Sequence, residues 1–213
     1  MRRLAAIVAL ALVCTGAALA AKGDPQKRHN PVDTAKAKSV VLRAADLAGW
    51  KAEPAKDTGD DNLHCKGFDP DESDLVETGN ADSPDFSKGL QFISSTASVY
   101  RTSTQAQASW DRVVKPGLLT CLKTLFEQGA STPGTTWTVL GQGTLSFPKL
   151  ASRTAAFRIA FRTKSSTLTL KGSVDIVLLG HGRIDAVMLY VAFGAPSQSL
   201  ERRLAGLMAA RMG

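Results

Sequence analysis

The stretch TQAQASWDRVVKPGLLTCLKTLFEQ, residues 104–128, decides how we expect the rest of the chain to fold. Pro116 and Gly117 lie inside it, and a proline removes an amide donor and clashes with the preceding helical turn. Two abutting helices are one outcome, but the unbroken apolar stripe favours a single kinked helix. The apolar residues of that stripe recur at the spacing that places them along one side of a helix: Ala106, Trp110, Val113, Leu118, Cys121 and Leu125.

The first twenty residues have the features of an export signal. Arg2 and Arg3 precede an apolar run at residues 4–13, and residues 18–20, Ala-Leu-Ala, form the small-x-small motif that a signal peptidase accepts. The run is shorter than the roughly 20 apolar residues of a membrane-spanning helix. Lipid attachment at Cys14 is disfavoured, because the valine before it is larger than the residue that lipoprotein processing prefers. We therefore expect a secreted or extracytoplasmic protein.

Removal of the signal leaves Cys65 and Cys121 as the remaining cysteines. Two thiols in an oxidising compartment favour a disulfide over the alternative of two buried free thiols. Closing a loop of this length stabilises the fold by up to about 4 kcal/mol in the chain-entropy treatment. We predict a disulfide that fastens the segment around Cys65 to the central helix.

The charges are unevenly distributed along the chain. The formal net charge is +7, with acids concentrated in residues 51–90 and bases in residues 149–213. A basic excess can indicate binding to nucleic acid or to an anionic surface. These bases are scattered singly along expected strands, with no aromatic residues interleaved. We therefore expect no nucleic-acid partner, and a basic face that the acidic segment partly neutralises.

The chain is predicted to have three parts. Residues 1–20 are the signal peptide, and residues 21–39, which are polar and lack an apolar period, are expected to form a flexible N-terminal lead. Residues 40–213 form a single domain. Residues 51–88 are rich in Asp, Gly and Pro and are expected to form a long loop. Whether its acidic part, residues 57–85, is ordered is left open.

The rest of the domain alternates between apolar and polar residues at the period of strands. A final amphipathic helix is expected at residues 199–212. We predict an α+β fold, with an antiparallel sheet of about five strands packed by the kinked central helix and by the C-terminal helix. The expected strand segments are residues 90–101, 136–140, 144–147, 155–162, 167–179 and 183–193, the last two joined at a Gly-His-Gly turn.

The order of these elements resembles that of small exported bacterial domains. It is carried by a series of loose motifs: Leu47-x-Gly49-Trp50, then Cys65, a strand, a helix with Trp110 and Cys121, and hairpins that end in Gly182-Arg183. In this order the chain is similar to the extracellular sensor domain of PknH-type receptor kinases and to PsbP-like α/β/α sandwiches. The likeness covers most of the mature chain and implies binding of a ligand or partner, often in the cleft between sheet and helices. Those sensor domains carry two disulfides, and this chain has cysteines for one.

Few residues suit catalysis. The histidines, His29, His64 and His181, lack the spacing of metal ligands, and the sequence contains neither an HExxH nor a Cys/His zinc pattern. A disulfide leaves no thiolate to act as a nucleophile, and no G-x-S-x-G motif is present. We predict no catalytic activity and no cofactor. The alternative is a secreted hydrolase that uses His181 with Asp175 or Asp185.

The acidic segment contains the one pattern that suits a metal ion. Asp69, Asp71 and Asp74 lie close together in the sequence, and calcium prefers six to eight oxygen ligands. The run lacks the central glycine and the terminal glutamate of an EF-hand loop, and Pro70 restricts its backbone. We predict a solvated acidic loop and no metal, with calcium as the weaker alternative.

A ligand- or partner-binding domain is the function that these observations favour. The predicted site is a cleft between the sheet and the helix at residues 104–128, bordered by the acidic segment. Its predicted lining is Tyr100, Trp110, Arg158 and Arg162. The expected occupant is a small molecule or an envelope protein partner. We expect the chain itself to have no integral membrane segment after signal cleavage. A purely structural envelope protein is the remaining alternative.

Overall fold

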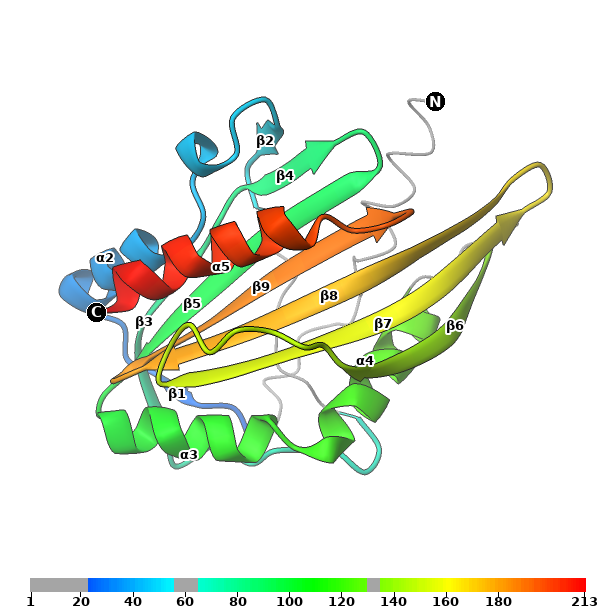
Figure 1. Cartoon of the computed structure of the whole chain (residues 1–213). Coiled ribbons are helices and arrows are strands. Elements are labelled where there is room, and N and C mark those ends of the chain that lie inside the picture. The colour runs from blue at the N-terminus through cyan, green and yellow to red at the C-terminus, as the bar shows by residue number, and fades with distance from the viewer. Residues whose placement is uncertain (1–22, 56–64, 130–134) are drawn as a thin grey trace.

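A mixed β-sheet separates the helices into two layers (Figure 1). The computed structural model describes residues 23–55, 65–129 and 135–213. Over these residues the fold is α+β, as predicted, with four α-helices and a short 3-10 helix: α2 (Pro31–Val40), η1 (Ala44–Asp46), α3 (Ser103–Val113), α4 (Pro116–Gly129) and α5 (Gln198–Met212). The strands are β1 (Gln26–Lys27), β2 (Lys51–Glu53), β3 (Val76–Asp82), β4 (Asp85–Lys88), β5 (Gln91–Tyr100), β6 (Thr135–Thr144), β7 (Arg153–Ser165), β8 (Thr169–His181) and β9 (Ile184–Phe193).

The described strands form one nine-stranded sheet in the order β1-β3-β5-β9-β8-β7-β6. β4 pairs with the start of β5, and β2 pairs with β4. β1 runs parallel to β3, whereas the other pairs in this order are antiparallel. The prediction of an antiparallel sheet of about five strands is therefore wrong in both the number of strands and the sheet type.

The strands that were not predicted lie in segments expected to lack regular structure. β1 belongs to the expected lead, and β2, β3 and β4 belong to the expected loop at residues 51–88. The sequence of β3, VETGNAD, has few of the β-branched and aromatic residues typical of strands. Pairing with β5, from Glu77 opposite Tyr100 to Asp82 opposite Thr96, fixes β3 all the same. Pairing with a long neighbouring strand thus outweighs a weak local preference.

Residues 21–39 are not a flexible lead over their described part. Asn30 caps α2 by accepting a hydrogen bond from the Asp33 amide, and Pro31 occupies the first helical turn. Ala37 and Val40 are fully buried. Gly79 of β3 lets the helix approach, because a Cβ atom on it would lie 2.3 Å from the Asp33 carbonyl carbon. The apolar residues of α2 are few and do not recur at an evident helical period, so the sequence did not predict this helix.

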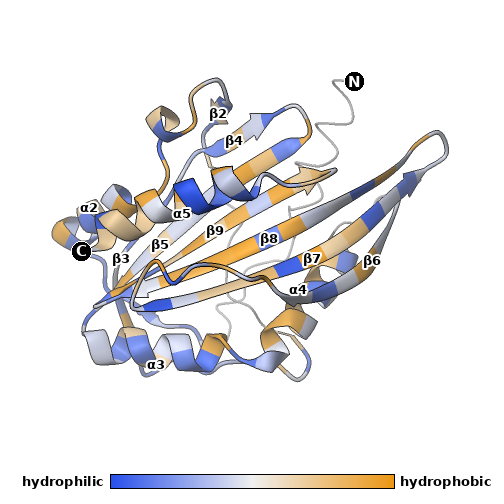
Figure 2. Cartoon of the chain, in the orientation of Figure 1, coloured by the Kyte–Doolittle hydropathy of each residue, from blue (hydrophilic) through white to orange (hydrophobic). Residues whose placement is uncertain are grey.

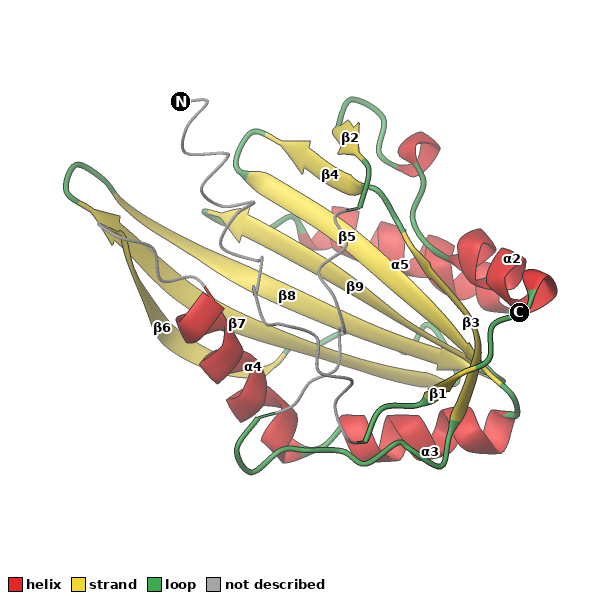
Figure 3. Cartoon of the chain, turned by 180° about the vertical axis from the view of Figure 1, so that it is seen from behind, coloured by secondary structure: helices red, strands yellow, loops and turns green. Residues whose placement is uncertain are grey.

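The stretch at residues 104–128 forms two helices, α3 and α4, and not one kinked helix. α3 begins after Thr102, whose hydroxyl accepts a hydrogen bond from the Gln105 amide, and it ends at Val113. Pro116 starts α4, where the missing amide hydrogen costs nothing. The apolar stripe continues across the break because both helices face the same side of the sheet (Figure 3).

The predicted disulfide between Cys65 and Cys121 is confirmed, with 5.4 Å between the two Cα atoms. It fastens the segment before β3 to α4. Phe68 and Leu118 are buried beside the bond. Gly117 leaves room for Phe68, since a Cβ atom at that position would lie 2.9 Å from the phenylalanine ring.

Two hydrophobic layers lie on opposite faces of the sheet. One is packed between the sheet and helices α2 and α5, and the other between the sheet and α4. Figure 2 shows hydrophobic residues running along β8 and β9, which lie at the centre of the sheet. Within the described segments, no helix is long and apolar enough to cross a membrane.

Gly79→Ala tests whether α2 docks on β3. The added methyl group would overlap the backbone of Asp33 and Thr34, so we expect a loss of roughly 1–3 kcal/mol in the free energy of unfolding, measured by urea denaturation. Gly206→Ala in α5 is the matched control, because a Cβ atom there meets open space and alanine favours a helix by up to about 1 kcal/mol. A Gly79→Ala protein as stable as the parent would contradict the docking.

Candidate functional site

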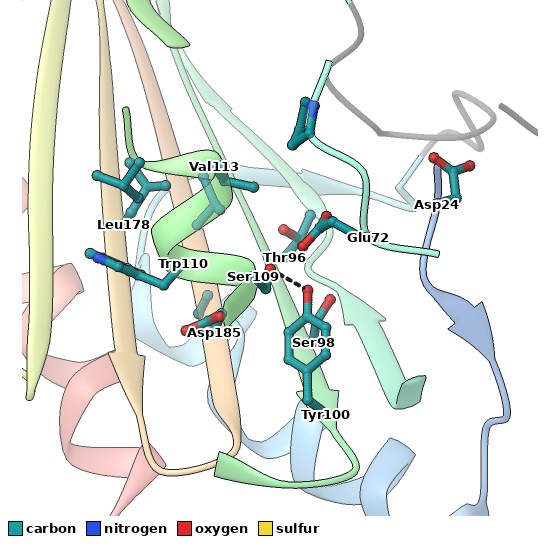
Figure 4. Close-up of a pocket in the computed structure, with 14 residues that line it drawn as sticks. Asp24, Glu72, Thr96, Ser98, Tyr100, Ser109, Trp110, Val113, Leu178 and Asp185 are labelled. Carbon is teal, nitrogen blue, oxygen red and sulfur yellow. Dashed lines mark hydrogen bonds between the residues drawn. The ribbon is translucent and has the colours of Figure 1, made fainter. Parts of the chain in front are cut away.

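A cavity of about 170 Å³ lies between α3 and the sheet, in the region where the cleft was predicted (Figure 4). One wall is α3, and the opposite wall is the sheet face made by β5, β8 and β9. The third wall comes from Pro70 and Glu72, which belong to the segment between the disulfide and β3, and from Asp24. We call residues 65–75 the strap.

The strap is held against the two helices at both of its ends. The disulfide joins Cys65 to α4. Near the other end, Arg112 of α3 donates a hydrogen bond to the Asp71 carbonyl, 2.6 Å away, and two to the Asp74 carboxylate, at 2.5 and 3.0 Å. Glu72 lies between these two attachments, and its amide donates to the Gly23 carbonyl. The position of Glu72 therefore depends on contacts that are far apart in the sequence.

One end of the cavity is apolar. It is lined by Trp110 and Val113 of α3 and by Leu178 of β8 (Figure 4), together with Val187 of β9. Leu178 and Val187 alternate along their strands with residues buried on the other face of the sheet, as the period of a strand requires. This end can accept an aliphatic or small aromatic group.

The other end of the cavity is polar. The Tyr100 and Ser109 hydroxyls are hydrogen-bonded at 2.8 Å, and both residues are buried. Tyr100 ends β5, and the short link to α3 brings Ser109 back over it two turns into the helix. Burial raises the pKa of Tyr100, and the nearby Glu72 carboxylate raises it further. The Tyr100 hydroxyl thus stays protonated at physiological pH.

Glu72 is the buried acid of this polar end. Only 7% of its surface is exposed, and its Oε1 atom has no hydrogen-bond partner within the described structure. Burial raises the pKa of the Glu72 carboxyl. A hydrogen bond with Ser109 and the charge of Arg112 oppose this shift, and the charges of Asp24 and Glu77 add to it. An unsatisfied buried acceptor in a cavity wall is rare in folded proteins and calls for a ligand or a water.

A second acid, Asp185, also lines the cavity, but it has a partner. Arg153 donates from Nη2 to Asp185 Oδ1 at 2.9 Å, and its guanidinium lies 5.8 Å from the centre of the Trp110 ring. Burial raises the pKa of Asp185 to about 6, against the lowering effect of Arg153. Asp185 therefore contributes a paired charge, and Glu72 an unpaired one.

The structure brings two of the four predicted cleft residues together. Tyr100 and Trp110 line the cavity, whereas Arg158 and Arg162 do not. Alternation along β7 turns Ile159 and Phe161 toward α4 and the two arginines toward the other face of the sheet. There Arg158 pairs with the fully buried Asp175, and Arg162 is exposed. The sequence showed the alternation of β7 but not which face carries the cavity.

Of the proposed hydrolase residues, Asp185 lines the cavity, whereas His181 and Asp175 do not. Ser152, just before β7, and His181, the last residue of β8, are both exposed, and the Ser152 hydroxyl lies 2.8 Å from His181 Nδ1. Asp175 and Asp185, the predicted carboxylate partners, each accept hydrogen bonds from an arginine of β7 instead. The described residues therefore form a serine–histidine pair, and neither Asp175 nor Asp185 is hydrogen-bonded to its imidazole.

The calcium alternative lacks a ligand cluster. Asp71 accepts hydrogen bonds from the amide and hydroxyl of Ser73, and Asp74 is paired with Arg112. No group of three acidic, histidine or cysteine residues in the described ranges could hold a metal ion, and Asp69 belongs to none. Residues 56–64, which include part of the acidic segment and His64, lie outside the described residues.

Sequence reasoning missed a buried acid on the opposite face of the sheet. Glu201, in the first turn of α5, is 1% exposed, and its two carboxyl oxygens have no partner within the described chain. Burial raises the pKa of Glu201 to about 7, with Asp175 adding to the shift and Arg158 and Arg202 opposing it. A charged residue on the inward side of a short amphipathic helix is the signal that could have identified it.

Glu72 and Ser109 were also missed. Glu72 belongs to an acidic run whose other members are exposed, and Ser109 adjoins the apolar stripe of the helix without being part of it.

No family model matches the chain, and no curated protein matches its sequence. The resemblance to exported sensor domains therefore remains a prediction.

Glu201→Gln tests the burial of that acid. The pKa of this carboxyl is about 7 in the folded protein, against an ordinary value of 4.5. Its contribution to stability is therefore fully present below pH 4.5 and is lost as the pH rises through 7. We expect the variant to be more stable than the parent at pH 8, by about 1–3 kcal/mol, and equal to it at pH 4.5. Urea denaturation at both pH values measures this. The exposed Glu53→Gln is the control, and an unchanged pH dependence in Glu201→Gln would contradict the assignment.

Proposed function

We propose that this chain is an extracytoplasmic binding domain that holds a small molecule in the cavity between α3 and the sheet and does not catalyse a reaction. The supporting observation is that an apolar end and a polar end with an unsatisfied acceptor occur in one cavity. Such a combination is typical of ligand sites, where a few placed polar groups fix the orientation of a mostly apolar ligand.

The size of the cavity limits the ligand. Drug-sized ligands occupy pockets of roughly 300–1,000 Å³, and the volume here is about 170 Å³. A molecule with a small polar head and a short apolar body suits this space. This role also agrees with the resemblance to sensor domains, which bind in a cleft between sheet and helices.

Binding is favoured over catalysis by the chemistry of the polar end. A general base needs a pKa near the operating pH and a proton to abstract within hydrogen-bond reach. The pKa of Tyr100 is raised, so the Tyr100–Ser109 pair supplies hydrogen bonds and no base. Asp185 is engaged by Arg153. Burial raises the pKa of Glu72 and that of Asp185, and we assign Glu72 to recognition of a donor group because its Oε1 atom has no hydrogen-bond partner among the described residues.

The extracytoplasmic location is part of the proposal. It is supported by the signal-like first twenty residues and by the disulfide between Cys65 and Cys121, since structural disulfides persist in oxidising compartments and are rare in the cytosol. Mass analysis of exported protein, which reports the cleavage point, tests this part separately from ligand binding.

A hydrolase is the second candidate, and the Ser152–His181 contact is the observation in its favour. Its exposed position gives a substrate no enclosing walls. Turnover of p-nitrophenyl acetate by the protein, lost in Ser152→Ala and in His181→Ala but retained in Ser166→Ala, would establish this alternative. We expect the three variants and the parent to show the same background rate.

Val187→Phe tests the cavity as the binding site. The larger side chain fills the apolar end, so we expect small-fragment ligands to lose about tenfold or more in affinity. A fragment screen by nuclear magnetic resonance, read at the Trp110 indole and the Ser109 amide, measures this. Val32→Phe on the exposed side of α2 is the matched control. Fragments that bind both variants equally, or that never perturb Trp110, would refute the proposal.

A further inference from the structure

We infer that the cavity selects a small organic cation, a primary ammonium with a short apolar tail, and that the Glu72 carboxylate is its counter-charge. This rests on the proposed function and adds the class of ligand to it.

The walls of the cavity carry acids and no base. Asp24, Glu72 and Asp185 line it, whereas no lysine, arginine or histidine is among the lining residues. Arg112, whose charge acts on Glu72, is paired with Asp74, and Arg153 is paired with Asp185. Glu72 makes no ion pair within the described part of the chain, so the polar end has an uncompensated acid.

A cation in the cavity would complete the hydrogen bonding of Glu72. A carboxylate buried without a partner is costly, and that cost falls when a cation hydrogen-bonds to it. An ammonium group has three donors and no acceptor. Glu72 Oε1 can accept one of them, and the hydroxyl oxygens of Ser98 and Ser109, which also line the cavity, can accept the others. An anionic ligand would meet repulsion from the same carboxylate.

An organic cation fits better than a metal ion. Calcium and similar ions need several oxygen ligands that converge on one point, and no such group of acids is present in the described segments. The apolar side chains of Val113, Leu178 and Val187 also line the cavity, and they have no atom that could coordinate a metal ion. An ammonium with a short alkyl tail uses both ends of the cavity.

Three probes of nearly equal size and different charge test the inference: n-butylammonium, n-butanol and n-butyrate. Each is titrated into the oxidised protein and followed at the Trp110 indole resonance. We expect n-butylammonium to bind about tenfold or more tightly than n-butanol, and n-butyrate to bind weakest. In Glu72→Gln, n-butylammonium should lose about tenfold in affinity while n-butanol changes by less than about threefold.

Asp111→Asn is the matched control, because it removes one negative charge from the exposed side of α3 and leaves the cavity walls intact. We expect it to bind all three probes as the parent does. Unchanged n-butanol binding in Glu72→Gln shows that this variant is folded and retains the cavity.

The outcomes separate the two proposals. If n-butanol binds at Trp110 and n-butylammonium binds no more tightly, or if Glu72→Gln and Asp111→Asn weaken n-butylammonium equally, the inference about charge is wrong and the binding cavity stands. If none of the three probes perturbs Trp110, both the inference and the proposed function are wrong.

Discussion

The attachment of the strap to the two helices is the constraint on which the cavity depends. A disulfide holds Cys65 on α4, and a bidentate ion pair holds Asp74 on α3. An exposed ion pair alone contributes little to stability. The disulfide reduces the conformational entropy of the unfolded chain and keeps the strap close to α4. Between these attachments Glu72 lies in the cavity wall, and its Oε1 atom has no hydrogen-bond partner among the described residues. Without the strap, α3 and the sheet would form an open groove.

Two buried carboxyl groups, Glu72 and Glu201, lie on opposite faces of the sheet, and their surroundings differ. Glu72 borders a cavity, together with hydroxyl groups and apolar side chains. Glu201 lies beneath α5, where Asp175 raises its pKa and Arg158 lowers it. Both acids destabilise the fold when ionised, because burial removes the water that would solvate them. We propose that the charge of Glu72 serves in recognition, because this acid lines a cavity. The packing beneath α5 makes Glu201 a determinant of how stability varies with pH.

The sequence predicted the features that depend on local pattern or covalent chemistry. The helical stripe, the disulfide and the strands β5, β7, β8 and β9 follow from periodicity and from the count of cysteines. The separate strands expected at residues 136–140 and 144–147 are instead one strand, β6, which ends at Thr144. The sequence did not predict β3 or α2, because their stability comes from pairing with β5 and from the close approach at Gly79. Trp110 and Tyr100, two of the predicted cleft residues, line the cavity, and both lie on elements whose period was clear. Glu72 could not be distinguished from its exposed acidic neighbours, because its burial is produced by contacts with residues distant in the sequence.

The protonation of Glu72 in the oxidised and the reduced protein tests the central claim most directly. The pKa of this carboxyl can be followed by carbon-13 magnetic resonance of its side chain, before and after reduction of the Cys65–Cys121 bond. The strap account predicts a pKa above the ordinary value of 4.5 in the oxidised protein and a return toward that value after reduction. A Glu72 that titrates at its ordinary value while the disulfide is intact, or a raised pKa that reduction leaves unchanged, would contradict it.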